Sequence, residues 1–299
     1  MKFSRSSLSR GAGSPDVTGF YDDDTGSIQY LVSDPETHKA ALIDVVFTFD
    51  PESAATDPAS VDKILNYAAH EGLEIEWILD THPHADHLMA SALLRDRLKK
   101  PNGIGEKVTG IAELWRDYYN MPDAFDTAAD FDRLFADGDT FEIGNLPVRV
   151  MLSPGHTLGS ITYIVGSDAA FVHDTFMQPD VGTSRADFPG GSATQLYESL
   201  QGILELPDDT RLFIGHDYGT EYRQEPAWES TVAEQRKHNA HIGGGVTKEA
   251  YVQTRESRDK TLALPDRMLH VLQLNLRAGQ PPEPEDDGNS YLKIPMNRF

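Results

Sequence analysis

The chain has 299 residues, of which 39% are hydrophobic, and this is enough to bury a full core in one large α/β domain or two small ones. Its 26 Lys and Arg stand against 48 Asp and Glu, so a formal charge of −22 repels phosphate backbones and anionic lipid surfaces, and neither a nucleic acid nor a membrane is expected as a partner. The sequence has no cysteine, which excludes disulfides, thiolate metal ligands and a cysteine nucleophile, so any sulfur chemistry must take place on a substrate.

The first 15 residues are rich in Ser and Arg and lack the apolar stretch of an export signal. No window of the chain approaches the roughly 18 uninterrupted apolar residues of a membrane span. We therefore expect a cytoplasmic protein with a flexible tail over residues 1–15. One domain is expected over residues 16–299, with a C-terminal extension that starts at about residue 220.

The first predicted elements form a β-α-β unit that leads into a polar motif. Residues 27–34 and 39–46 are predicted strands joined by a polar turn, and residues 59–71 carry apolar side chains at helical spacing. Residues 75–79 form an apolar run typical of a buried strand. A helix is predicted over residues 90–98, so the motif between them lies on a strand-to-helix turn.

The second half of the chain repeats the order of strands followed by helices. Residues 131–153 alternate apolar and polar side chains around two glycine turns, and two short strands follow at 160–167 and 169–175, which predicts a second sheet. A helix over 193–205 and a strand over 211–216 come next. The remaining predicted elements are helices over 227–238, 247–258 and 266–272, and an extended surface segment over 279–287.

The motif after the strand at 75–79 concentrates side chains that bind metals. His82, His84, Asp86 and His87 lie within six positions, and a turn leaving a strand end can aim alternate residues at one point. The alternative is a polar loop in which Asp86 caps the next helix. The complete H-x-H-x-D-H string favours a metal site over that alternative.

Three further candidate ligands lie at the ends of predicted strands. They are His156 in Ser-Pro-Gly-His-Thr, Asp174 in Val-His-Asp-Thr, and His216 in Ile-Gly-His-Asp. Their regular placement predicts that all three share one site with the motif. His173 and two other histidines lack such a context and are interpreted as ordinary polar residues; the two others are His238 and His241.

The order H-x-H-x-D-H, PGHT, strand-end Asp and GHDY resembles the metallo-β-lactamase superfamily over roughly residues 20–220. The resemblance implies an α/β fold, an αββα sandwich of two mixed β-sheets flanked by helices, here with a helical C-terminal extension. It also implies seven ligands that could hold two zinc ions: His82, His84 and His156 on one, Asp86, His87 and His216 on the other, and Asp174 between them.

Segments outside these ligands resemble the bacterial type of persulfide dioxygenase, a glyoxalase II-like subfamily, over nearly the whole chain. These segments are residues 182–191, 215–218, 234–236, Asn239 and 275–279. The resemblance implies oxidation of glutathione persulfide by O2 to sulfite and glutathione, with one Fe(II) per chain on His82, His156 and Asp174. Two histidines and one carboxylate leave coordination positions open, as an oxygen-activating iron requires. His84, Asp86, His87 and His216 then orient ligands and hold waters.

The same resemblance suggests substrate contacts. Arg185 is expected to pair with a glutathione carboxylate, and the alternative is a salt bridge with Asp187. Tyr218 and Arg236 are carried over as further peptide contacts, with packing as the alternative role. Asp187 is expected to brace its loop and a ligand histidine.

Two other functions remain open at this stage. A dinuclear zinc hydrolase of glutathione thioesters, like glyoxalase II, would use the same ligands and a metal-bound hydroxide. A non-catalytic metal-binding protein would be expected to have lost ligands, and none is missing. Zinc can also displace iron from an imidazole-carboxylate site, so the sequence does not fix the metal. The family resemblance further suggests a homodimer.

Overall fold

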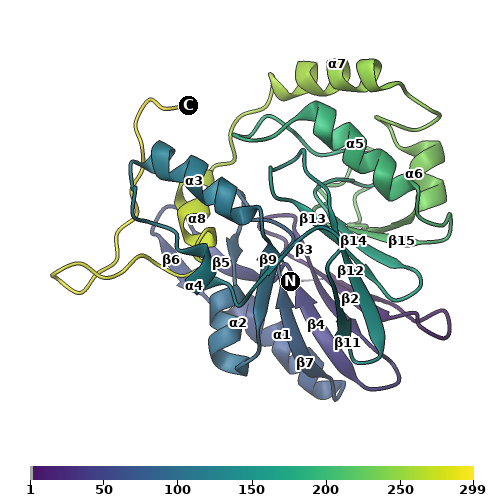
Figure 1. Cartoon of the computed structure of the whole chain (residues 1–299), viewed down its shortest axis with the longest axis horizontal. Coiled ribbons are helices and arrows are strands. Elements are labelled where there is room, and N and C mark those ends of the chain that lie inside the picture. The colour runs from purple at the N-terminus through teal and green to yellow at the C-terminus, as the bar shows by residue number, and fades with distance from the viewer. Residues whose placement is uncertain (1–2) are drawn as a thin grey trace.

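The computed structural model describes residues 3–299, and it places two β-sheets face to face with helices on both outer sides (Figure 1). This is the αββα sandwich expected from the order of the motifs, so the predicted fold class is confirmed. Within the described range, no helix is both long enough and apolar enough to cross a membrane.

The first sheet is mixed and carries the predicted β-α-β unit. In spatial order its strands are β1 (Phe3–Ser7), β2 (Asp16–Tyr21), β3 (Ile28–Ser33), β4 (Lys39–Ile43), β7 (Glu74–Leu79), β9 (Asn102–Gly105) and β10 (Arg133–Phe135). β1 to β4 pair antiparallel, whereas β4, β7, β9 and β10 run parallel. The carboxyl ends of β4 and β7 therefore meet at one edge, where the metal-binding motif leaves β7.

The second sheet supplies the other strand ends. Its strands are β11 (Thr140–Ile143), β12 (Leu146–Leu152), β13 (Ile161–Val165), β14 (Ala169–His173), β15 (Arg211–Ile214) and β16 (Glu229–Thr231). β14 and β15 are parallel neighbours, so Asp174 and His216 follow them at the same edge. The predicted second sheet starts later than residue 131, because residues 133–135 pair with β9 in the first sheet.

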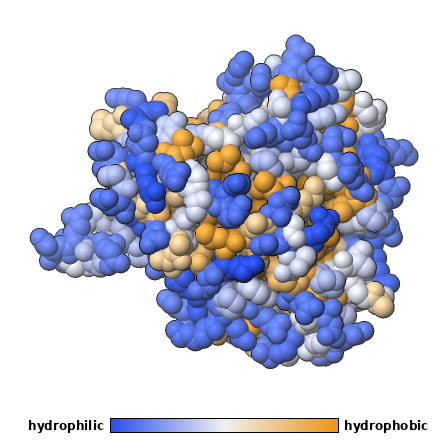
Figure 2. Space-filling view, viewed as in Figure 1, coloured by the Kyte–Doolittle hydropathy of each residue, from blue (hydrophilic) through white to orange (hydrophobic). Residues whose placement is uncertain are grey.

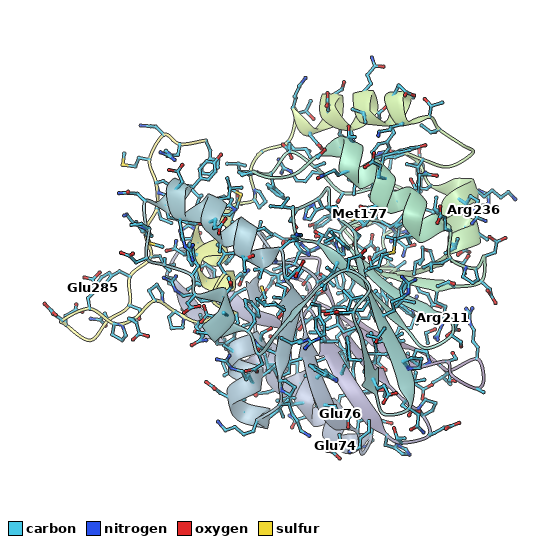
Figure 3. The ribbon with its side chains drawn as sticks, viewed as in Figure 1. Glu74, Glu76, Met177, Arg211, Arg236 and Glu285 are labelled. Atoms are coloured by element: carbon cyan, nitrogen blue, oxygen red, sulfur yellow. The ribbon has the colours of Figure 1, made fainter. Side chains whose placement is uncertain are left out.

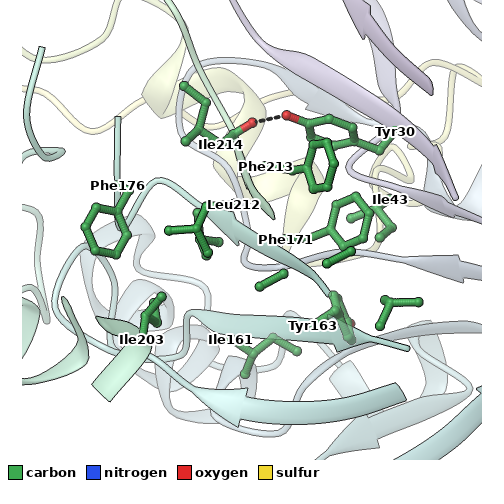
Figure 4. Packing of buried hydrophobic residues seen from close by; sticks show 14 of the residues in the cluster. Tyr30, Ile43, Ile161, Tyr163, Phe171, Phe176, Ile203, Leu212, Phe213 and Ile214 are labelled. Atoms are coloured by element: carbon green, nitrogen blue, oxygen red, sulfur yellow. Dashed lines mark hydrogen bonds between the residues drawn. The ribbon is translucent and has the colours of Figure 1, made fainter. Parts of the chain in front are cut away.

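The main core lies between the two sheets. Strand β3 is buried along its whole length, since helices cover the outer face of its sheet. Its Tyr30 ring packs edge-on against Phe171 at 5.2 Å and Phe213 at 5.6 Å between ring centroids. The Tyr30 hydroxyl donates a hydrogen bond to the Ile214 carbonyl at 2.5 Å (Figure 4). The buried phenol thus satisfies its polar group at the end of β15, next to the candidate site.

Helices cover the two outer faces separately. α1 (Ala59–His70) and α2 (Ser91–Leu98) pack on the first sheet, and α5 (Ala193–Leu204) packs on the second. α7 (Lys248–Asp259) lies on α5 (Figure 1). The remaining helices and the small sheet are α3 (Val108–Tyr119), α4 (Thr127–Asp130), α6 (Val232–His238) and α8 (Met268–Asn275), with β6 (Ala55–Asp57), β5 (Val46–Asp50) and β8 (Leu88–Met89).

The helices differ from the prediction in two places. α3 was not predicted, although Ile111 and Trp115 lie on its buried face at helical spacing. The helix predicted over 227–238 begins only at Val232, because Glu229–Thr231 pairs with β15 instead. Thr231 then starts α6 through a capping box with Glu234.

The prediction of a flexible tail over residues 1–15 also needs correction for residues 3–15. Residues 1–2 lie outside the described range. Phe3–Ser7 forms β1 on the edge of the first sheet. The fully buried guanidinium of Arg211 binds the Ser14 hydroxyl and the Pro15 carbonyl, each at 3.0 Å, and Asp168 at 2.9 Å. A buried guanidinium requires acceptors, and the N-terminal segment supplies them.

The C-terminal segment after α8 runs over the surface without helices, as predicted for residues 279–287, and Glu285 lies at the tip of its loop (Figure 3). Phe299 ends this segment and stacks on Tyr118 at 5.1 Å. The face seen in Figure 2 is largely hydrophilic at its rim, with apolar side chains gathered toward its middle. This distribution agrees with the acidic composition.

Replacing Arg211 with methionine should lower the free energy of unfolding by about 3–5 kcal/mol, because the substitution leaves the carboxylate of Asp168 without its buried partner. Urea unfolding of the full chain measures this loss. Arg236→Met is the matched control: its half-exposed ion pair with Asp208 should contribute about 0–1 kcal/mol. Equal losses in the two variants would contradict the anchoring role of Arg211.

Candidate metal centre

The metal-binding motif is held in place by a buried carboxylate that sequence reasoning missed. Asp44 follows β4 with a φ of 52°, and its two oxygens accept from the Thr81 amide and the Thr81 hydroxyl, each at 2.8 Å. One of these oxygens also lies 3.1 Å from Nε2 of His84. A lone acid inside the apolar run Ala-Leu-Ile-Asp-Val-Val was the signal that could have found it.

Three predicted ligands converge on one point. Nε2 of His82 lies 3.7 Å from Oδ2 of Asp174, and Nε2 of His156 lies 3.6 Å from the same oxygen. The three ligand atoms all lie within 4.8 Å of one another, and all three side chains are buried. An ion at the ordinary bond length of about 2.0–2.2 Å can reach all of them from a position between them.

Hydrogen bonds select the ring nitrogens that face this point. Nδ1 of His156 lies 2.9 Å from the Arg185 carbonyl, which can only accept, so Nδ1 carries the proton and Nε2 keeps a lone pair. The Thr81 hydroxyl donates to Asp44 and therefore accepts from Nδ1 of His82 at 3.0 Å. Burial also holds the pKa of His82 and of His156 below the ordinary value, so both imidazoles are neutral and ready to bind a cation.

A second group lies beside the first. One ligand atom each from His84, Asp86 and His87 falls within 4.8 Å of the other two. Nε2 of His84 donates a hydrogen bond to Asp44, and Nδ1 has no hydrogen-bond partner among the described residues. Neither ring nitrogen of the buried His87 has such a partner in that range. Buried polar atoms without partners are costly, and a metal ion would satisfy them.

His216 lies between two carboxylates. Its Nδ1 is 2.6 Å from Oδ1 of Asp174, and its Nε2 is 2.7 Å from Oδ2 of Asp86. Burial lowers the pKa of His216, but the two carboxylates outweigh burial and raise it well above the ordinary value. The Asp174 carboxylate is thus divided, with one oxygen facing His82 and His156 and the other facing His216.

His173 was interpreted from the sequence as an ordinary polar residue, but its ring packs against the ligand His82. Its ring is buried 5.1 Å from the ring of His82, and its Nε2 lies 2.9 Å from the Thr175 hydroxyl. Burial lowers the pKa of His173 to about 3, so the ring stays neutral. His241 was interpreted in the same way, yet it lines the pocket described below; His238 is exposed.

The C-terminal extension braces the motif. Nδ2 of Asn275 donates to the carbonyls of His84 and His87, each at 2.8 Å, and its Oδ1 accepts from the Met89 amide at 2.9 Å. Gly279 has a φ of 88°, and a Cβ there would lie 2.0 Å from the Met89 carbonyl oxygen. The segment 275–279, which carried part of the family resemblance, therefore acts on the backbone of the metal-binding motif.

A pocket of about 390 Å³ opens beside the first ligand group. His156, Asp174 and His216 lie in its wall, and the predicted substrate contacts Arg185 and Tyr218 line it too. The Tyr218 ring stacks on His216 at 5.9 Å between centroids, with its hydroxyl 3.5 Å from Asp86. The full lining is Ala85, Asp86, His156, Asp174, Met177, Val181, Thr183, Ser184, Arg185, Phe188, His216, Tyr218, His241, Arg255, Arg258, Leu262, Ala263 and Pro265.

Arg185 and Asp187 adopt the alternative arrangement considered in the sequence analysis. The guanidinium of Arg185 binds both oxygens of Asp187, at 2.7 and 2.9 Å, and donates to the Ala263 carbonyl at 2.7 Å. Asp187 does not contact a ligand histidine; the carbonyl of Arg185 holds His156 instead. The side chains thus brace the loop through an ion pair, and the backbone of that loop orients the ligand.

Of the three predicted substrate contacts, Arg185 and Tyr218 line the pocket and Arg236 does not. Its guanidinium pairs with Asp208 and the Leu204 carbonyl on the outer side of α6. In Figure 3 it lies at the edge of the molecule, well apart from the pocket residue Met177. The prediction of a peptide contact by Arg236 is therefore wrong. The neighbouring Gln235 is buried and donates to the Met177 carbonyl.

Asn275→Ala should weaken zinc binding about 10- to 100-fold, because the two motif carbonyls lose the donor that fixes them. Competition with a chromogenic chelator measures the affinity. The control is Gln273→Ala, which removes an equally buried amide of α8 that binds Leu269 and Lys293 rather than the motif. If both variants lost zinc affinity equally, the brace would be no more than a contribution to stability.

Comparisons with known proteins agree with this geometry. The model of the metallo-beta-lactamase superfamily matches residues 25–216. The beta-lactamase hydrolase-like protein of Xylella fastidiosa strain Temecula1 is 54% identical over 95% of this chain, which spans just under two thirds, 65%, of that relative. The mitochondrial persulfide dioxygenase ETHE1 of Bos taurus is 28% identical over 84% of this chain and 83% of its own length. The crystal structure of ETHE1 from Myxococcus xanthus superimposes with a TM-score of 0.69 at 28% identity, covering 88% of this chain and 98% of that one. With its motifs gathered at one edge of an αββα sandwich, the chain belongs to the metallo-β-lactamase superfamily.

Proposed function

We propose that the chain is a persulfide dioxygenase that converts glutathione persulfide, O2 and water to glutathione, sulfite and two protons. The observation that carries the proposal is the convergence of His82, His156 and Asp174 beside an open pocket. Two imidazoles and one carboxylate on one side of an ion are the donor set of oxygen-activating non-haem iron. The likeness to the two ETHE1 proteins supports the same reaction.

The donor atoms suit Fe(II), which when bound supplies open positions for the substrate sulfur and for O2 and electrons for oxygen activation. The chain's own residues prepare that position. The hydrogen bonds to Thr81 and to the Arg185 carbonyl keep the lone pairs of His82 and His156 directed inward. His216 holds the second oxygen of Asp174, so the carboxylate cannot rotate away from its ligand position.

The pocket supports a small sulfur-bearing substrate. Its wall near the ligands includes the apolar side chains of Met177, Val181 and Phe188, which exclude water from a reactive sulfur. The sequence has no cysteine, so it holds no thiol of its own to carry the sulfur. No thiol of these 299 residues lines the pocket, and this supports a reactive sulfur that is brought in by the substrate, such as the persulfide of a small thiol.

Asp174→Ala should abolish binding of iron and lower kcat/KM for oxygen uptake by about 1000-fold or more, or about 4 kcal/mol. The test is anaerobic reconstitution with Fe(II), iron analysis, and oxygen uptake with glutathione persulfide. Asp208→Ala, which removes a mostly exposed aspartate, is the control and should behave like the parent chain. Full turnover by the Asp174 variant would rule out this ligand set.

The second candidate is a dinuclear zinc hydrolase of glutathione thioesters. The observation that favours it is a second group, His84, Asp86 and His87, whose unpartnered nitrogens suit another ion. In this group His84 takes the place that the resemblance gave to His216. The hydrolase-like name of the Xylella relative points the same way. Two zinc ions, which the two ligand groups would hold, would supply Lewis-acid activation of water and of the thioester carbonyl.

His87→Ala separates the two candidates, since His87 has no hydrogen-bond partner in the described chain that its removal would orphan. For the dioxygenase, the variant should keep one iron per chain and lose no more than about tenfold in oxygen uptake. A hydrolase would lose its second ion and its thioester turnover. Thioester hydrolysis by the zinc-loaded parent that exceeds persulfide oxidation by the iron-loaded parent, and that His87→Ala eliminates, would favour the hydrolase.

A further inference from the structure

Arginines gather in the pocket wall although the formal charge of the chain is −22. Three arginines line it: Arg185, Arg255 and Arg258. Asp187 neutralises Arg185, and Asp259 neutralises Arg255 at the next turn of its helix. No carboxylate within residues 3–299 forms an ion pair with Arg258. Its charge is therefore the one arginine charge of the pocket that remains available to a ligand.

Helix α7 places this charge at the pocket's margin. Arg255 and Arg258 are three positions apart, so they lie on neighbouring parts of one helix face. Arg255 is buried and donates to the Thr183 carbonyl at 2.9 Å, whereas Arg258 is exposed. Arg255 thus anchors the helix beside the pocket, and the exposed Arg258 lines the same pocket, where an incoming anion can reach it.

His241 supplies a second donor nearby. The Thr183 amide donates to its Nδ1 at 2.9 Å, so Nδ1 is unprotonated and the ring proton is on Nε2. Burial, with the charges of Arg255 and Arg258, lowers the pKa of His241 to about 4, so the ring is neutral at neutral pH. A Cβ on Gly182 would lie 2.4 Å from Nδ1, which means that the ring packs directly on the glycine backbone and is fixed.

We propose that Arg258 and Nε2–H of His241 form a carboxylate subsite on the α7 side of the pocket. This inference rests on the proposed function for the persulfide, and it specifies the carrier as a small thiol with at least one carboxylate. A guanidinium binds a carboxylate with two parallel hydrogen bonds, and the apolar surface of Leu262 and Pro265 beside it lowers the competition from water. The pocket volume of about 390 Å³ lies in the range of small-molecule sites.

The subsite also explains how an anionic substrate can enter. The chain's overall field repels anions at long range, so attraction must come from a local cation that no protein carboxylate neutralises. Arg185, to which the sequence analysis assigned this role, is already bound by both oxygens of Asp187. Arg258 takes the role instead, from a helix that lies outside the residues matched by the superfamily model.

Steady-state kinetics of the iron-loaded full chain test the subsite with two persulfides. Arg258→Gln should raise KM for glutathione persulfide about tenfold with kcat unchanged, since a charge-assisted hydrogen bond to the carrier is lost. KM for cysteamine persulfide, which has no carboxylate, should stay the same. Lys260→Gln is the control, because it makes the same charge change at the C-terminal end of α7 on a residue that does not line the pocket. Equal effects on both substrates, no effect on either, or an equal effect of Lys260→Gln would overturn the proposal.

A binding measurement separates this inference from the proposed reaction. Calorimetric titration of the zinc-loaded chain with glutathione and with its dimethyl ester needs no turnover. Glutathione should bind about tenfold more tightly than the ester, and Arg258→Gln and His241→Phe should each reduce that difference. If this pattern holds without any oxygen uptake in the iron-loaded chain, the subsite stands and the dioxygenase assignment fails. If glutathione and its ester bind the parent chain alike, the subsite is wrong whatever the turnover.

Discussion

Three buried imidazoles of the candidate metal centre belong to His82, His84 and His156. Each donates a hydrogen bond from one ring nitrogen, which leaves the other nitrogen unprotonated. Two acceptors come from distant segments: the Asp44 carboxylate accepts from His84, and the Arg185 carbonyl accepts from His156. The third is the hydroxyl of the neighbouring Thr81, which accepts from His82. Because an imidazole binds a cation only through an unprotonated nitrogen, these acceptors decide which atoms can be ligands. The rest of the site follows from that choice, since Asp174 faces the lone pairs of His82 and His156 with one oxygen and His216 with the other.

Much of this arrangement is predictable from local sequence, and the rest is not, for physical reasons. His82 follows β7 of the first sheet, whereas His156 and Asp174 follow β12 and β14, which run in the same direction on either side of β13 in the second sheet. Each ligand thus comes directly after a strand, and their convergence at one edge could be expected. Asn275 acts through its amide on backbone carbonyls, and no pattern of residue types identifies such partners across 191 positions. Arg236 was assigned to the pocket through the family resemblance, and a resemblance between motifs does not tell which face of a short helix meets a pocket.

The net charge of the chain likewise does not predict the electrostatic field inside the pocket. The formal charge of −22 correctly describes a molecule with a hydrophilic, acidic surface, but an average says nothing about one wall of one pocket. There the arrangement of ion pairs decides the local field: Asp187 and Asp259 neutralise two arginines and leave Arg258 free. A substrate experiences this local field only after it has come within a Debye length of about 8 Å at physiological salt.

The contact between Asn275 and the metal-binding motif can form only after both segments have been synthesised, and Asn275 is made much later than the motif. The amide that holds the carbonyls of His84 and His87 lies about 190 residues later in the chain, and synthesis proceeds from the N-terminus. A nascent chain on the ribosome already carries every ligand before it has the residue that steadies their loop. The fixed backbone of the metal-binding motif is therefore a property of a chain that has been synthesised at least as far as Asn275.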